Sequence, residues 1–362
     1  MIPEDRLRNI PEDRRVHHMF CFAVHDRMVE VIRQYEAARV ADVHIRFPDE
    51  ATQRAFEAAA NPVKFLMETG AEQVAKRIIL NHVVLPLFAD VLHFLHETLK
   101  AFENRKYAVA FALMRKALKY DLMFATWLLA DPDDFYAEMA SPAKDMDDRA
   151  IQPKRRRALL AEAVRRIDAG GLFNAETIYG LVFDRKRADG LAAYFDLAAH
   201  LVTSNPAYPT EEFNLNFIFK NPSDTDVYYG VYDRLAYLVL YLFLLELAIF
   251  DRMEPIPEWY GTWAAFTALG AFASLFNAND TSYLDILNRG YRDYLRCIVC
   301  AEVIAISHDN APLLFLNEEL ACGACGREQQ FPLFWLMARA GHRENHEPVD
   351  EGSKQSPDAD RV

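Results

Sequence analysis

The sequence lacks the short motifs that mark several common catalytic folds. None of the strings GxxxxGK[ST], GxGxxG, HExxH or GxSxG occurs among its 362 residues. These strings provide the phosphate-binding loops, zinc ligands and nucleophilic serine of P-loop, Rossmann, zincin and α/β-hydrolase proteins. The sequence therefore gives no support to any of those four classes.

The sequence also lacks an excess of basic residues, because its formal net charge is −13. Binding to duplex nucleic acid requires cations that neutralise phosphates, so the charge argues against a general nucleic-acid coat. One basic run extends from Lys154 to Arg157, and Arg165 and Arg166 follow it. This run predicts either a solvated helix start after Pro153 or a local patch for a nucleic acid or an acidic partner.

A membrane-spanning helix needs about twenty consecutive apolar residues. The apolar run from Leu235 to Phe250 is shorter than that. A helix that is apolar all round is typical of the centre of a bundle, where Glu246 would need an ionic or hydroxyl partner. The chain begins with charged residues rather than with a signal-peptide core, and Cys21 lies among apolar residues as a buried small hydrophobe would. We therefore expect no membrane association and a cytoplasmic location.

Apolar residues recur at spacings of three and four over most of the chain, which indicates amphipathic helices. The predicted fold class is mainly α, with a large helical bundle over residues 1–296 and an internal linker at 140–153. Pro86 is expected to kink a helix or to open a new one. The alternating run 213–219 predicts one strand.

Four cysteines near the end of the chain form two CxxC pairs, and they are Cys297, Cys300, Cys322 and Cys325. Two pairs at this separation are typical of a structural zinc site, in which four thiolates complete a tetrahedral shell and leave no open position for catalysis. Redox-active thiols and an iron or iron–sulfur group are the alternatives. Disulfides would need an oxidising compartment, which nothing else in the sequence indicates.

The residues around these pairs predict a zinc-ribbon subdomain over 297–340. We expect a β-hairpin between the two knuckles, with strands at 301–306 and 313–316 joined by a turn at 307–310. Gly323 and Gly326 are expected where the second knuckle needs a positive φ or a close backbone approach. The polar residues 341–362 predict a disordered acidic tail.

Asp90, His93 and Glu97 lie on one face of a predicted helix. They form either a polar helix face or part of a second metal site. A carboxylate-bridged metal bundle needs Glu-x-x-His twice, whereas the sequence offers one Asp-x-x-His. The polar face is therefore the preferred interpretation.

The string Arg77-Ile-Ile-Leu-Asn-His82 resembles the Arg-x4–6-His ribonuclease pair of the HEPN superfamily, although Ile78 stands where that family usually has a polar residue. Leu113-Met-Arg-Lys-Ala-Leu118 and Leu128-Leu-Ala-Asp-Pro132 resemble uncharacterised bacterial all-helical proteins with a HEPN-like bundle. The resemblance covers about residues 75–255 and implies a helical scaffold, often linked to stress or phage defence. It also implies that Arg115 and His200 face each other.

The function predicted from these features is that of a zinc-binding helical scaffold whose ribbon contacts a protein or nucleic-acid partner. The alternative is a metal-independent ribonuclease of HEPN type that uses Arg77 with His82, or Arg115 with His200. A general acid–base pair requires its members to converge on one substrate. Arg77 and His82 are five residues apart, so their directions on a helix differ by about 140°. The non-enzymatic function is therefore preferred.

Overall fold

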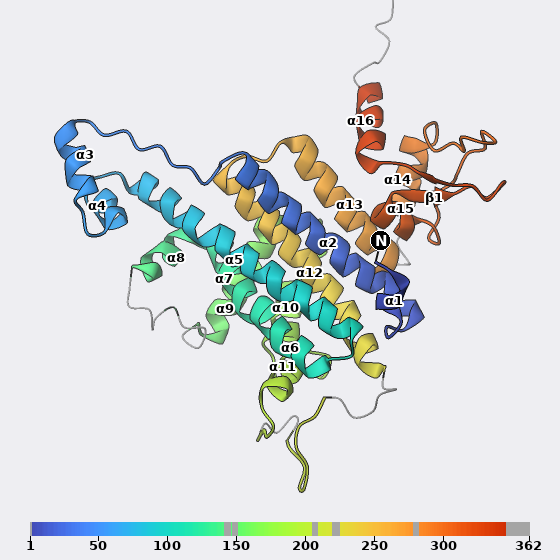
Figure 1. Ribbon diagram of the computed structural model, residues 1–362, viewed down its shortest axis with the longest axis horizontal. Coiled ribbons are helices and arrows are strands. Elements are labelled where there is room, and N and C mark those ends of the chain that lie inside the picture. Colours follow the sequence, from blue (N-terminus) through green and yellow to red (C-terminus); the bar gives the residue numbers. More distant parts are fainter. Residues whose placement is uncertain are drawn as a thin grey trace, which may run out of the picture. The chain divides into compact units, whose positions relative to one another are not determined.

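The computed structural model describes residues 2–140, 146, 151–204, 209–218, 225–277 and 282–344 (Figure 1). The chain divides into two compact units, Met1–Asn277 and Ala278–Val362. In the described ranges the first unit is helical, and the second combines helices with a two-stranded antiparallel sheet. The mainly α fold class with a small C-terminal sheet is confirmed.

The first unit is a helical bundle in which four long helices, α2, α5, α12 and α13, run side by side (Figure 1). Shorter helices cover this group and connect its members. The helical elements of the unit are α1 (Glu4–Leu7), α2 (Glu12–Ala37), α3 (Glu50–Glu57), α4 (Pro62–Glu68), α5 (Glu72–Glu103), α6 (Tyr107–Arg115), the π-helical turn η1 (Lys116–Asp121), α7 (Leu122–Ala130), α8 (Pro132–Met139), α9 (Pro153–Ile167), α10 (Ala175–Val182), α11 (Ala192–Ala199), α12 (Asp226–Met253) and α13 (Glu258–Phe276).

The core of the bundle is α12. Every residue from Leu238 to Leu247 is buried, and ten residues make almost three helical turns, so no side of this segment faces solvent. Helices α2, α5, α7, α9 and α13 pack around it. The prediction of a buried core helix at Leu235 to Phe250 is confirmed.

A buried polar network joins four helices at one end of the bundle. Glu103 of α5 accepts hydrogen bonds from Arg6 of α1 (Nε to Oε2, 2.9 Å) and from His18 of α2 (Nε2 to Oε1, 3.2 Å). Burial lowers the pKa of His18, and the neutral ring accepts a 2.6 Å bond from Tyr232 of α12 at Nδ1. Burial opposes ionisation of Glu103, but the bonds from His18 and Arg6 bring its pKa down to about 2. The network therefore fixes how α1, α2, α5 and α12 align.

Several local predictions need correction. Pro86 lies inside the continuous helix α5 and does not open a new one. The run 213–219 forms no strand over its described part, 213–218, because Phe213 has a left-handed φ of 60° and the side chains of Asn214 and Asn216 bond to backbone groups. The predicted linker 140–153 lies largely outside the described residues, which also exclude 345–362 of the predicted tail.

Helix α5 is the one helix in the described ranges that is long and apolar enough to cross a membrane by length and composition. One third of its most apolar window (33%) is buried in the structure. The same helix packs against α2, α4 and α6 within the bundle. A core helix of a soluble protein has these properties as well.

The second unit contains α14 (Ser282–Tyr291), α15 (Ala311–Asn317), β1 (Glu319–Ala321), β2 (Glu328–Gln330) and α16 (Leu333–Glu344). The predicted strand at 313–316 is wrong, because these residues lie in α15. Pro312 stands in the first turn of that helix, where its fixed φ and missing N–H are favourable. The predicted strand at 301–306 forms only an isolated bridge, from Val303 to Arg296.

Glu246 of α12 generates a prediction about stability. Its side chain is fully buried, and among the described residues neither carboxyl oxygen has a hydrogen-bond partner of the kind expected from the sequence. Burial raises the pKa of Glu246 far above its ordinary 4.5. Between these two values the folded protein keeps a proton that the unfolded chain releases, so stability falls as pH rises.

We expect Glu246→Leu to raise the free energy of unfolding by about 1–3 kcal/mol at pH 7, because it removes an unsatisfied polar group from the core. The gain should become smaller at pH 5. Urea denaturation at both pH values measures it, and Glu36→Leu on the exposed face of α2 is the control. A loss of stability in Glu246→Leu would show that the carboxyl group has a stabilising role.

Candidate metal centre

The four cysteines predicted as ligands lie together in the second unit. Their sulfur atoms all lie within 4.8 Å of one another. The separations from Cys297 to Cys325, Cys300 to Cys322 and Cys300 to Cys325 are 3.5, 3.6 and 3.7 Å. A metal–sulfur bond of ~2.3 Å gives a tetrahedral edge of ~3.8 Å, whereas a disulfide needs ~2.05 Å. The cluster therefore has the geometry to hold a metal ion.

The two CxxC knuckles have the same backbone construction. In the first, Ala301 N–H donates to the Cys297 carbonyl (2.9 Å) and Cys297 N–H donates to the Glu302 carbonyl (2.9 Å). In the second, Gly326 and Cys322 make the corresponding bonds, at 2.8 and 2.9 Å. Each knuckle is thus the tip of its own short hairpin, and no hairpin spans the interval between them.

A left-handed residue follows each knuckle. Gly326 has a φ of 71° and Ala301 has a φ of 61° at the equivalent position. Gly323 has no positive φ, and a Cβ atom there would meet nothing within 4 Å, so the expected need for glycine at Gly323 is wrong. The first knuckle therefore has the same turn without the residue best suited to it.

Gln329 of β2 links the two hairpins. Its Oε1 accepts from Ile298 N–H (3.0 Å), and its Nε2 donates to the Arg296 carbonyl (2.9 Å). Asn288 of α14 holds the next segment in the same way, with two 2.8 Å bonds to Ile306. Neither residue could be predicted from the sequence, because a single side-chain amide has no spacing signal of its own.

The cysteines differ in exposure and in proton affinity. Cys297 and Cys322 are buried, whereas Cys300 and Cys325 are exposed. The backbone N–H groups of Cys300 and Val299 donate hydrogen bonds to the Cys297 sulfur, and these bonds lower the pKa of Cys297 to about 6. The Glu302 N–H lowers the pKa of Cys300, but the adjacent sulfur of Cys322 and the other thiols raise it to about 12. Four adjacent thiolates need a cation between them, and metal binding would release the remaining protons.

The other residues singled out from the sequence form no second metal cluster in the described ranges. Asp90 binds Lys116 of η1 (2.8 Å), and His96 binds Glu97 (3.0 Å). His93 is exposed beside a cavity of about 420 Å³ that His25 and His96 also line. These residues form a polar face, as the preferred interpretation states.

The pairs implied by the HEPN resemblance are not joined by a hydrogen bond or ion pair in the described part of the chain. Arg77 donates to the Val40 carbonyl (3.3 Å) and lines a cavity that His82 does not line. Arg115 donates to the Tyr120 hydroxyl (3.1 Å). His200 is exposed at the C-terminal end of α11, a helix that packs against α6.

The basic run at the start of α9 is used within the first unit. Arg155 pairs with Asp134 of α8 and covers the Trp127 ring at 4.4 Å. Arg157 pairs with Glu176 (3.0 Å) and lies 3.6 Å from the centre of the Tyr179 ring. These contacts join α9 to α8, α7 and α10. Arg155 and Arg157 therefore stabilise the packing of these helices.

Comparison with protein-family models, with curated proteins and with solved structures finds no match for this chain. The HEPN-like resemblance therefore stays a prediction.

The turn at Ala301 generates a prediction. A left-handed φ costs an L-residue about 1–2 kcal/mol, and glycine avoids this cost. We expect Ala301→Gly to strengthen binding of Zn²⁺, used as a probe, by about fivefold. Ala324→Gly changes a residue with an ordinary φ and is the control. Competition with a chromophoric chelator measures both, and equal or weaker binding by Ala301→Gly would contradict the assigned turn.

Gln329 generates a second prediction about the site. Residues that hold metal ligands in place typically contribute 10–100-fold to metal affinity. We expect Gln329→Ala to weaken Zn²⁺ binding by about tenfold or more, because the first knuckle loses its bonds at Ile298 and Arg296. Gln330→Ala, on the adjacent exposed residue, should leave the affinity unchanged. Equal effects of the two substitutions would show that Gln329 does not position the site.

Proposed function

We propose that the protein is a zinc-dependent interaction protein, in which a four-cysteine zinc centre presents an apolar knuckle to a partner protein. Zinc suits the site because four thiolates close a tetrahedral shell, as in structural zinc modules. No ligand position is left for a substrate, so the metal would have a structural role. The thiols must stay reduced to bind it, which fits a cytoplasmic location.

The observation that carries the proposal is the tip of the first knuckle. Ile298 and Val299 lie between the ligands Cys297 and Cys300, and they are 78% and 67% exposed. Solvent exposure of two adjacent β-branched apolar residues is unfavourable unless a partner covers them. The metal would hold this pair away from the core of its own unit, because both flanking residues would be ligands.

The charge of the second unit favours a protein over a nucleic acid as the partner. Residues 282–344 contain six arginines and no lysine, against eight aspartates and glutamates. Nucleic-acid binding depends on neutralising phosphates, and an acidic unit does not provide this. An exposed apolar pair is instead typical of the centre of a protein–protein contact.

The proposal predicts two separable properties. Elemental analysis of freshly reduced protein should give one zinc per chain in the native protein and in Ile298→Ser/Val299→Ser. Cys300→Ser should lose the zinc while the helical circular dichroism of the first unit persists. Affinity capture from cell lysate should retain one or more proteins on the native chain and lose them on both variants. Capture should resist nuclease treatment.

Leu215→Ser is the matched control, because Leu215 is an exposed apolar residue of the first unit (42%). It should keep both zinc and the captured protein. Iron in place of zinc, or capture unaffected by the knuckle substitutions, would contradict the proposal. RNA cleavage that survives EDTA and is lost in His82→Ala or His200→Ala, but not in His93→Ala, would favour the ribonuclease hypothesis instead.

A further inference from the structure

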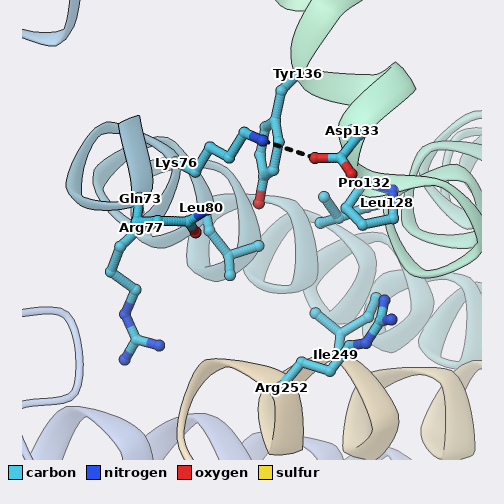
Figure 2. A pocket seen from close by; sticks show the side chains of 10 residues that line it. All are labelled: Gln73, Lys76, Arg77, Leu80, Leu128, Pro132, Asp133, Tyr136, Ile249 and Arg252. Atoms are coloured by element: carbon cyan, nitrogen blue, oxygen red, sulfur yellow. Dashed lines mark hydrogen bonds and ion pairs between the residues drawn. The ribbon is translucent and has the colours of Figure 1, made fainter. Parts of the chain in front are cut away.

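The first unit contains a cavity of about 420 Å³ that belongs to none of the sites above. It lies between α5, α7, α8 and the end of α12 (Figure 2). Three cations, one carboxylate, a phenol and apolar side chains line it, and these are Gln73, Lys76, Arg77, Leu80, Leu128, Pro132, Asp133, Tyr136, Ile249 and Arg252. Its volume is within the range of small-molecule sites.

The three cations differ in how far they are neutralised. Lys76 pairs with Asp133 (2.7 Å) and with Glu72 (2.8 Å). Arg77 has a carboxylate no closer than Glu254, at 3.9 Å. Arg252 has no carboxylate within 4.0 Å in the described part of the chain, and it donates one 2.8 Å bond to the Leu129 carbonyl. Positive charge at Arg252, and in part at Arg77, is left without a counter-ion.

A second cavity, of about 540 Å³, meets the first at Arg252 and is lined by Arg165, Arg166, Asp168 and Asp251 among others. Arg165 and Arg166 share one carboxylate, Glu162. Arg166 and Arg252 both line this second cavity. Burial and then the repulsion from Arg166 lower the pKa of Arg252, against opposing effects of Tyr136 and Glu162. A bound anion would relieve this repulsion.

Tyr136 provides a neutral donor to the same space. Its side chain is largely buried and lines the cavity. Figure 2 shows the ring extending from α8 with its hydroxyl between the side chains of α5 and those of α7 and α8. Burial raises the pKa of this hydroxyl and the charge of Asp133 adds to the rise, whereas the charges of Lys76, Arg252 and Arg77 oppose it. A hydroxyl that faces a cavity can donate a hydrogen bond to an acceptor bound there.

We propose that this cavity binds a small organic anion, with its phosphate or carboxylate group on Arg252 and the Tyr136 hydroxyl, while Arg77 adds positive charge from α5. Guanidinium groups form paired, charge-assisted bonds with the oxygens of both groups. The apolar part of the ligand lies on Leu80, Leu128 and Ile249. The ion pair with Lys76, which Glu72 shares, offsets part of the negative charge of Asp133.

Calorimetric titration of the full zinc-loaded chain tests the site with three probes that share a phenyl ring. Phenyl phosphate and phenylacetate carry the two anionic groups, and 2-phenylethanol is neutral. We expect at least one anion to bind with one site per chain and a dissociation constant of about 0.1–1 mM. The neutral probe should bind at least about tenfold more weakly. The tighter anion identifies the charged group as phosphate or carboxylate.

Three substitutions locate the binding. Arg252→Gln should weaken the anion by about tenfold, Arg252→Lys by less, and Tyr136→Phe by about threefold, because the last removes only one neutral hydrogen bond. Arg33→Gln, which changes an exposed arginine paired only with Glu30, should have no effect. Tyr136→Phe keeps the packing and so reports on the site even where Arg252→Gln affects folding. Equal binding of all three probes, no binding at millimolar concentration, or unchanged anion affinity in Tyr136→Phe and Arg252→Lys would overturn the proposal.

Discussion

The first unit depends on the burial, on every side, of the central segment of α12 from Leu238 to Leu247. A helix that is apolar on every side has no stable position except inside a shell of other helices, and α2, α5, α7, α9 and α13 provide that shell. The chain reaches this arrangement only after more than 200 residues, because the central helix comes late in the sequence. Most of the preceding helices therefore gain their apolar contacts from a segment that follows them.

This dependence explains which parts of the fold could be predicted. The run at Leu235 to Phe250 specifies a core helix by itself, and the cysteine spacing predicts the four side chains that cluster with the geometry to hold a metal ion. The run at 313–316 could not be assigned in the same way, because four apolar residues suit a strand or a short helix equally. Its conformation follows from Pro312 at the helix start. Ala301 and Gln329 were missed because their roles depend on a turn and on a contact between two hairpins, neither of which has a sequence period.

The basic run in the sequence does not indicate which cations lack a carboxylate partner in the structure. The conspicuous basic run supplies Arg155 and Arg157 to ion pairs and aromatic rings inside the unit. Arg252, one residue before the end of the apolar helix, is inconspicuous in the sequence, yet it lacks a carboxylate partner among the described residues. Whether a cation is available to a ligand depends on which carboxylates the fold brings within about 4 Å of it, and the local density of arginines does not determine that.

The two units hold their loops in place by different means. The first unit has a large core, and that core tolerates a polar residue without a partner at Glu246. The second unit has two strands of three residues, which are too short to stabilise a sheet alone. A metal bound by four thiolates would join both knuckles with an energy that a core of this size does not provide. Because the metal would supply this energy, the knuckle residues between the ligands need not be buried, and Ile298 and Val299 can remain exposed for contact with another protein.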